Sequence, residues 1–339
     1  MVQSRAITEG FDLYPATPAQ AGYGVFSTWT PSVTSSFLLE AGRFGGQCLT
    51  NTNSSGREIT RGVLSTTQIV VGFAYRRSLD LENLVCGLQS SAGNPQFYLS
   101  LDSIGRLFVS RTNSAASALA ITPERAIHLN TWHYIEWIVE LSDTVGSCEV
   151  WLDGVEVAVL TLTNIDTKAH ADSDIGRVRF GTSAYSVDDM YVEIDGLTRV
   201  GEGRITTRAV SADDTVDFVP STGSSNYATI DEIPPVTTDY NSSTTTGDKD
   251  LFAVADLGFV PTVVYGVQVS TLSQKDEAGT RTMQNRIVSG GVEENGQVDA
   301  LTLNSFTFKR SWHPTDPDGA VAWTGTTVDS VKIGYELVL

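Results

Sequence analysis

Cysteine is scarce in this chain, and the few cysteines form no recognisable pattern. The 339 residues include three cysteines, Cys48, Cys86 and Cys148, and an odd number cannot pair completely within one chain. Their spacing fits no zinc-binding pattern. Because Cys86 and Cys148 lie in apolar, strand-like segments, where cysteine behaves as a small hydrophobic residue, we expect buried free thiols and no metal site.

Positive charge is also scarce. The chain has 22 Lys and Arg against 40 Asp and Glu, which gives a formal net charge of −18. Binding to phosphate groups needs clustered basic residues, so this balance argues against nucleic acid and an anionic membrane surface as partners.

Long hydrophobic runs are missing as well. No stretch of 18 apolar residues occurs, so the sequence predicts no insertion into a membrane. Residues 1–15 contain one basic residue and no apolar core, so no secretory signal is predicted. We therefore expect the chain to be made and assembled in the cytoplasm.

What the sequence does contain is typical of a β-rich protein. Only 18% of the residues are charged although 41% are hydrophobic, and threonine and valine recur throughout. Helix-rich chains use more lysine than the five lysines found here. The sequence thus predicts an all-β fold, and the length corresponds to about two domains.

Several segments predict individual strands and hairpins. Residues 132–141 alternate with Ile135 and Trp137 on an inward face and Glu136 on a mixed face. Asp153-Gly154 lies between two alternating runs and predicts a two-residue type I′ turn.

The register that this turn sets would pair apolar residues on one face and polar ones on the other. The expected pairs are Leu152 with Val155, Val150 with Val157, Cys148 with Val159, and Trp151 with Glu156. A second hairpin is expected between 97–102 and 106–111.

Changes in composition along the chain predict three parts. Residues 1–200 read as a large β-sandwich, 201–250 as an extended polar connector and 251–339 as a smaller, sandwich-like β domain. A short helix is expected at 250–257. The strands expected after it are 260–271, 283–289, 301–309 and 328–338.

The sequence contains no recognisable catalytic or metal-binding motif. The chain has no H-E-x-x-H motif, nucleophile elbow or phosphate-binding loop. Asp316-Pro317-Asp318-Gly319 is interpreted as a turn, since a calcium loop would need glutamate where Thr327 stands. No catalytic, cofactor-binding or metal-ligating residue is predicted. The four histidines are interpreted as surface or core residues: His128, His133, His170 and His313.

One segment, 188–195, is rich in acidic residues. On a strand, Asp189, Glu193 and Asp195 share a face, which suits a calcium ion or a glycosidase pair. Laminarinase-type glycosidases carry a Glu-x-Asp-x-x-Glu strand, but Thr198 stands where the second glutamate would be. The favoured interpretation is a solvent-facing acidic strand.

Five short motifs then occur in a characteristic order. They are EGFDLY at 9–14, GRFGGQCL at 42–49, NTWHYIE at 130–136, VWLDGV at 150–155 and VDDMYV at 187–192. Together they resemble concanavalin A-like (laminin G-type) jelly-roll domains. The form with a GRFGG-type segment resembles structural proteins of tailed bacteriophages, and later segments resemble the C-terminal region of the same proteins: 218–232, 239–240, 316–318 and 323–324.

This resemblance implies a function. It indicates a non-enzymatic virion protein, a component of the tail, fibre or capsid surface that assembles as a homo-oligomer, expected to be a trimer, with other virion proteins. No cofactor is implied. The alternative is a lectin-like module that binds host surface polysaccharide, and a glycoside hydrolase is less favoured. The aromatic residues singled out as sugar platforms are Trp29, Trp132, Trp151 and Tyr185.

Overall fold

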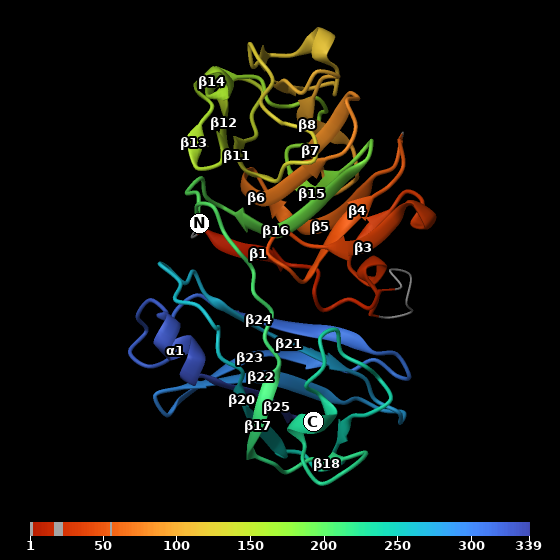
Figure 1. The fold of residues 1–339 in the computed structure, drawn as a ribbon, viewed down its shortest axis with the longest axis vertical. Coiled ribbons are helices and arrows are strands. Elements are labelled where there is room, and N and C mark those ends of the chain that lie inside the picture. The colour runs from red at the N-terminus through yellow and green to blue at the C-terminus, as the bar shows by residue number, and fades with distance from the viewer. Residues whose placement is uncertain (1–2, 17–22, 55) are drawn as a thin grey trace. The chain divides into compact units, whose positions relative to one another are not determined.

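The computed structural model describes residues 3–16, 23–54 and 56–339, mostly as antiparallel strands (Figure 1). They form two compact units: the first chiefly Thr28–Ile205 with residues 3–12, the second chiefly Thr206–Leu339 with Leu13–Pro15. In the described part the only α-helix is α1 (Gly325–Ser330). Short 3₁₀ turns are η1 (Val25–Ser27), η2 (Thr34–Ser36), η3 (Ala115–Ser117), η4 (Ala158–Leu160) and η5 (Tyr227–Thr229).

Two large sheets make up the first unit. The nine-stranded sheet follows the order β13 (Val155–Glu156), β12 (Gly146–Leu152), β11 (His133–Glu140), β6 (Gln68–Arg77), β16 (Tyr185–Ile194), β4 (Gln47–Asn51), β3 (Phe37–Ala41), with β1 (Ser4–Glu9) on β16 and β14 (Leu162–Ile165) on β12. The seven-stranded sheet follows the order β10 (Ala120–Ile121), β9 (Leu107–Ser110), β8 (Pro95–Leu101), β7 (Asn83–Gln89), β15 (Ile175–Phe180), β5 (Ile59–Thr66), β2 (Thr30–Pro31).

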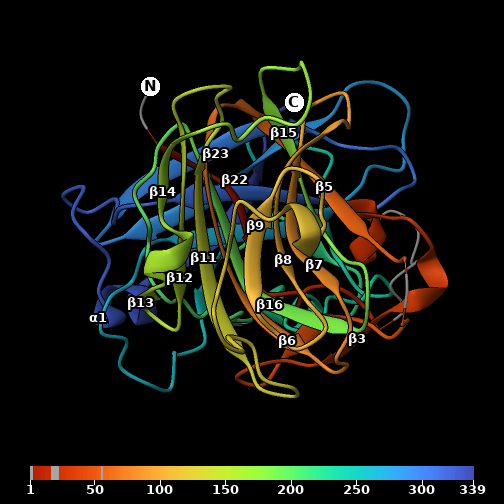
Figure 2. The ribbon, with the colours of Figure 1, turned by 90° about the horizontal axis from the view of Figure 1, so that it is seen from above.

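The core of this unit lies between the two sheets, which Figure 2 shows from above. Phe97 of β8 stacks on Trp137 of β11, with ring centroids 5.8 Å apart. Phe73 of β6 meets Phe180 of β15 edge to face at 5.0 Å. Such pairs add to the hydrophobic gain from burying the rings. The predicted all-β class is confirmed: a two-sheet sandwich is followed by a smaller β unit.

The predicted turn at Asp153-Gly154 is confirmed, since both residues have positive φ, 50° and 78°. Leu152 pairs with Val155 and Trp151 with Glu156, as expected. The predicted register fails further along, because η4 interrupts the strand and Cys148 pairs with Leu162 of β14 in place of Val159.

The expected core face of this hairpin is wrong at its tip. Val155 is 69% exposed because β13 is the edge strand of its sheet. The second hairpin is confirmed, with Leu99 opposite Val109 and Leu101 opposite Leu107.

The second unit is built on a five-stranded sheet. Its order is β17 (Val210–Thr215), β20 (Lys249–Val254), β25 (Lys332–Leu337), β22 (Thr282–Ser289), β23 (Val292–Ala300). The other pairs are β21 (Val267–Ser273) with β24 (Thr307–His313) and β18 (Val219–Pro220) with β19 (Asn241–Ser242). Val269 of β21 packs on Ile287 of β22 together with Trp323 and Val331, and these residues form a core between the β21–β24 pair and the five-stranded sheet.

The structure differs from the predicted division of the chain between 200 and 257. It divides the chain after Ile205, and the expected connector supplies β17, β18 and β19 to the second unit. The expected helix at 250–257 is wrong, since β20 lies there. The fully buried Asp250 accounts for the attachment of the polar stretch to this unit. Its carboxylate accepts hydrogen bonds from the amides of Asp217 and Phe218 and thus fixes that stretch on the sheet, where Asp250 itself belongs to β20.

Candidate functional site

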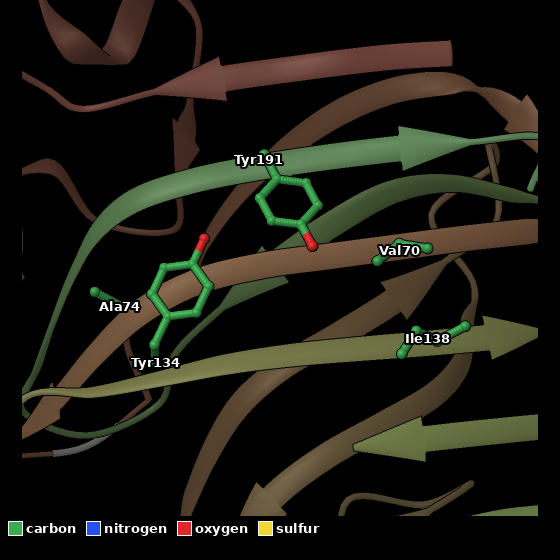
Figure 3. Close-up of a cluster of buried hydrophobic side chains, with 5 residues drawn as sticks. All are labelled: Val70, Ala74, Tyr134, Ile138 and Tyr191. Carbon is green, nitrogen blue, oxygen red and sulfur yellow. The ribbon is translucent and has the colours of Figure 1, made fainter. Parts of the chain in front are cut away.

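A cluster of apolar and aromatic side chains occupies the outer face of the nine-stranded sheet, where β11, β6 and β16 run side by side (Figure 3). Tyr134 of β11 lies opposite Ala74 of β6, and Ile138 lies opposite Val70. Tyr191 of β16 completes the cluster. This face points away from the core between the sheets, yet all five residues are at most 5% exposed.

Tyr191 reaches across β6 because residue 72 is a glycine. A Cβ atom at Gly72 would stand 2.0 Å from a ring carbon of Tyr191, so any larger residue would displace the ring. In the position that glycine allows, the Tyr191 hydroxyl donates a hydrogen bond of 2.5 Å to Oε1 of Glu136 on β11. One side chain thereby links three adjacent strands.

The segment that follows β16 explains why this outer face is buried. Residues 196–205, here called the covering segment, return over the sheet, with Val200 packed on the aromatic cluster. The amide of Val200 donates to the Tyr191 hydroxyl at 3.1 Å. The amide of Thr198 donates to Oε1 of Gln3 at 2.9 Å, which fixes the start of the segment.

Glu136, which is 1% exposed, is the carboxylate that the covering segment neutralises. Its Oε2 accepts from Nε and Nη2 of Arg199 at 3.0 and 2.9 Å, and its Oε1 accepts from the amide of Gly201 at 2.6 Å. Arg199 also stacks on Trp151 at 4.0 Å from the ring centroid. A buried carboxylate is tolerated when its charge and lone pairs are satisfied in this way.

A pair of adjacent acids, Asp188 and Asp189, forms the other end of the site. A bulge in β16 after Asp188 gives Asp189 a φ of +47°. The Asp188 carboxylate accepts from the amide of Arg43 at 2.8 Å, and the Asp189 carboxylate accepts from the amide of Ile205 at 2.8 Å. The pair therefore holds the GRFGG segment on one side and the end of the covering segment on the other.

Both acids are hard to ionise in this position. Burial, followed by the neighbouring charge of Asp189, raises the pKa of Asp188 to about 7. Burial raises the pKa of Asp189 to about 6, against the opposing effects of the Ile205 hydrogen bond and the Arg43 charge. Oδ2 of Asp189 has no hydrogen-bond partner, and Nη1 of Arg43 stands 3.9 Å from it.

The prediction of a solvent-facing acidic strand at 188–195 is wrong. All ten residues of β16 are buried, because the covering segment and β1 lie against it. Glu193 forms an ion pair with Arg5 at 2.5 Å, and Asp195 accepts from the hydroxyl of Thr66 at 2.9 Å.

The four aromatic residues singled out for sugar binding divide into two groups. Trp29 and Tyr185 are buried in the core at 0% and 1% exposure. Trp132 and Trp151 are half-buried at the edge of the aromatic cluster, and each is capped by an arginine, Arg76 on Trp132 at 4.7 Å and Arg199 on Trp151.

The expectations for the cysteines and for the turn at 316–319 agree with the structure. The three cysteines are free and buried, and burial raises the pKa of the Cys148 thiol to about 12. Asp316 lies at the start of a turn that is closed by an antiparallel bridge between Asp316 and Val321. His133 bonds Asp153 and His313 bonds Glu294. Throughout residues 3–16, 23–54 and 56–339, no group of three acidic, histidine or cysteine side chains could hold a metal ion, and no helix could span a membrane.

Chemically, this site is a closed network. Glu136, Glu193 and Asp189 each face an arginine of the same chain, and the covering segment separates Glu136 from solvent. The covering segment was not predicted, because the expected boundary at 200 assigns half of it to the polar connector. Gly72 in an otherwise apolar strand was a usable signal, since such a glycine often marks a close approach.

Comparisons with known proteins give no match to a family profile and none to a curated protein sequence. Solved structures with a similar fold include a heptameric SAP-like pentraxin from Limulus polyphemus, at 18% identity over 42% of this chain and 71% of the pentraxin, with a TM-score of 0.32. The Emp46p carbohydrate recognition domain has 10% identity over 56% of this chain and 98% of its own, with a TM-score of 0.35.

A third similar structure is the catalytic domain of a glycoside hydrolase family 131 protein from Coprinopsis cinerea. It has 16% identity over 59% of this chain and 98% of its own, with a TM-score of 0.37. These neighbours include both binding domains and an enzyme, and nothing in the comparisons connects the chain to a bacteriophage.

Proposed function

We propose that this chain is a non-catalytic structural protein of a tailed bacteriophage particle, an oligomeric component of the tail, fibre or capsid surface. The observation that carries the non-catalytic part is the covered outer face of the nine-stranded sheet. A glycosidase needs two carboxylates that reach a sugar from opposite sides. Here Glu136 is 1% exposed and bonded to Arg199, and Glu193 is bonded to Arg5.

The particle location rests on the motif order described from the sequence, and the acidic surface supports it. A net charge of −18 keeps a protein soluble at high copy number. The segment 258–266 of the second unit supports self-association, because it exposes apolar side chains to solvent: Val260 is 93% exposed and Val263 58%. We propose a homo-oligomer, a trimer, in contact with other virion proteins.

Two measurements test this proposal together. Light scattering of the purified protein at micromolar concentration should give three times the subunit mass of 36.5 kDa. Mass spectrometry of purified phage particles should find the chain at a fixed copy number, and cryo-electron microscopy of the particles should place it. A monomer that is absent from particles would refute the proposal.

Glycan recognition is a second candidate function, favoured by a groove on the seven-stranded sheet whose lining includes the hydroxyl groups of Thr30 and Thr60 and the guanidinium of Arg177. A glycan array, run with and without calcium, tests it. Binding to host-type glycans without release of reducing ends is expected if the chain is a lectin-like module. An array without hits would count against it.

A further inference from the structure

The seven-stranded sheet carries a groove on its surface near its β2 edge. The groove has a volume of about 440 Å³, and it is lined by β2, β5 and β15. Gly62 of β5 is part of the lining, and an added Cβ there would meet nothing closer than the Gly176 carbonyl oxygen at 4.0 Å. Because residue 62 has no side chain, this part of the groove is open.

Polar groups of several kinds line the groove. Hydroxyl groups come from Thr30, Ser32 and Thr60, and a carboxylate comes from Glu58. The charge of Glu58 is already balanced, because its Oε2 lies 2.7 Å from Nη1 of Arg179. Its backbone is fixed to Ser32 by two hydrogen bonds of 2.7 and 2.9 Å, so this wall of the groove is preformed.

Arg177 gives the groove its charge. On β15 it lies directly opposite Gly62, and its side chain is half-buried. Its guanidinium donates to the Ser91 carbonyl oxygen at 2.9 Å, and no carboxylate of the described residues forms an ion pair with it.

We propose that this groove binds a short segment of an acidic polysaccharide, with a sugar carboxylate on Arg177 and sugar hydroxyls on Thr30, Ser32 and Thr60. The proposal rests on the second candidate function, glycan recognition, and gives it a place and a ligand class. Arginine binds carboxylates through two parallel hydrogen bonds, and hydroxyl-lined walls exchange hydrogen bonds with sugars.

The size and charge of the groove limit the ligand. A volume of about 440 Å³ lies within the range for small-molecule sites, which suits one or two sugar rings. One unpaired cation suits a single carboxylate. Nucleic acid is a poorer fit, because its binding needs several clustered basic residues and Arg177 alone supplies positive charge to the groove lining.

The test titrates the full-length protein with a hyaluronan tetrasaccharide, whose glucuronates supply the carboxylate, and follows binding by calorimetry or NMR. Cellotetraose serves as the neutral ligand and inorganic phosphate as the free anion. We expect the acidic tetrasaccharide to bind in the millimolar range, more weakly with added salt, and at least tenfold more tightly than either control.

Two variants place the binding in the groove. Gly62→Thr fills this part of the groove with a residue that favours strands, at a position with room for it, so folding should be kept while binding is lost. Arg177→Gln should weaken binding of the acidic tetrasaccharide by about tenfold or more. Lys332→Gln, which removes one positive charge from the second unit, is the matched control and should bind as the native protein does.

The outcomes separate this site from glycan recognition in general. No binding of the acidic tetrasaccharide at 10 mM, or binding that Gly62→Thr leaves unchanged, overturns the groove proposal. Binding of phosphate as tight as that of the sugar overturns the sugar assignment. Binding of the neutral sugar that both variants leave unchanged keeps glycan recognition and refutes this site.

Discussion

Replacing Asp189 by asparagine should make the protein less sensitive to pH. Asp189 is 4% exposed, and burial raises its pKa from 3.8 to about 6. The asparagine keeps the oxygen that accepts from the Ile205 amide, and its amide group replaces Oδ2, which has no hydrogen-bond partner. Asparagine also tolerates the φ of +47° at this position.

The sign of the effect follows from the direction in which the pKa moves on folding. The folded state holds a proton on Asp189 up to about pH 6, whereas the unfolded chain releases it near 3.8. The contribution of Asp189 to stability is therefore greatest below about pH 4 and is lost as the pH rises to about 6. A pKa difference of about two between the folded and unfolded states corresponds to about 3 kcal/mol. Asp188, with a pKa of about 7, adds a further decline up to that pH.

In Asp189→Asn the contribution of residue 189 to the pH dependence of stability disappears. The pKa of Asp188 should also drop, because the charge beside it is gone. The free energy of unfolding falls between about pH 4 and pH 8 in both proteins. In the variant this fall should be smaller than in the native protein by up to about 3 kcal/mol. For a unit of this size, that is about 6–12 °C in melting temperature. At high pH the loss of the Arg43 attraction offsets part of the gain.

The assay is urea unfolding followed by tryptophan fluorescence at five pH values spaced evenly from about 4 to about 8. Asp102→Asn is the matched control. Burial alone would raise the pKa of Asp102, but hydrogen bonds and the charge of Arg106 hold it below its usual range. The Asp102→Asn variant should therefore be less stable than the native protein at neutral pH. If Asp189→Asn declines with pH as steeply as the native protein, the buried acidic pair does not set the pH dependence.

Three further predictions concern the covered face and the core. Gly72→Ala should destabilise the protein by about 1–3 kcal/mol, because its Cβ would collide with Tyr191, whereas Gly62→Ala should be nearly neutral; urea unfolding compares the two variants. Arg199→Ala should cost about 1–3 kcal/mol by leaving Glu136 buried without its ion pair, with Arg199→Lys intermediate; equal stabilities of these variants and the native protein would contradict the role of the covering segment. A thiol reagent should label no cysteine in the native protein and three after unfolding; fast native labelling would disprove burial of Cys48, Cys86 or Cys148.

Local signals in the sequence predicted the parts of the fold that depend on neighbouring residues. The Asp153-Gly154 turn needs two positive φ values, and its residue types state this directly. The alternation in 132–141 placed Ile135 and Trp137 in the core correctly. Free, buried cysteines followed from the apolar surroundings of Cys86 and Cys148.

The errors arose where long-range contacts decide. Asp250 appeared to begin a helix, but it is buried by amides more than 30 residues away in sequence. Asp189 appeared to face solvent, but the return of 196–205 over the sheet places the Ile205 amide on its carboxylate and helps to bury it. No local sequence pattern predicts that a later segment folds back over the sheet. The only indications in the sequence are Gly72 and the polar Glu136, each within a hydrophobic strand.

The covering segment also has a consequence for how the chain is made. β1, at the start of the sequence, pairs with β16, and the outer face of β16 is complete only when residues up to Ile205 are present. During synthesis the ribosome must therefore release more than 200 residues before the first sandwich closes, and until then its aromatic outer face and its first strand lack their partners. Chaperones that bind exposed apolar strands would meet the nascent chain in this interval, and a codon change that delays translation between 190 and 205 would prolong it.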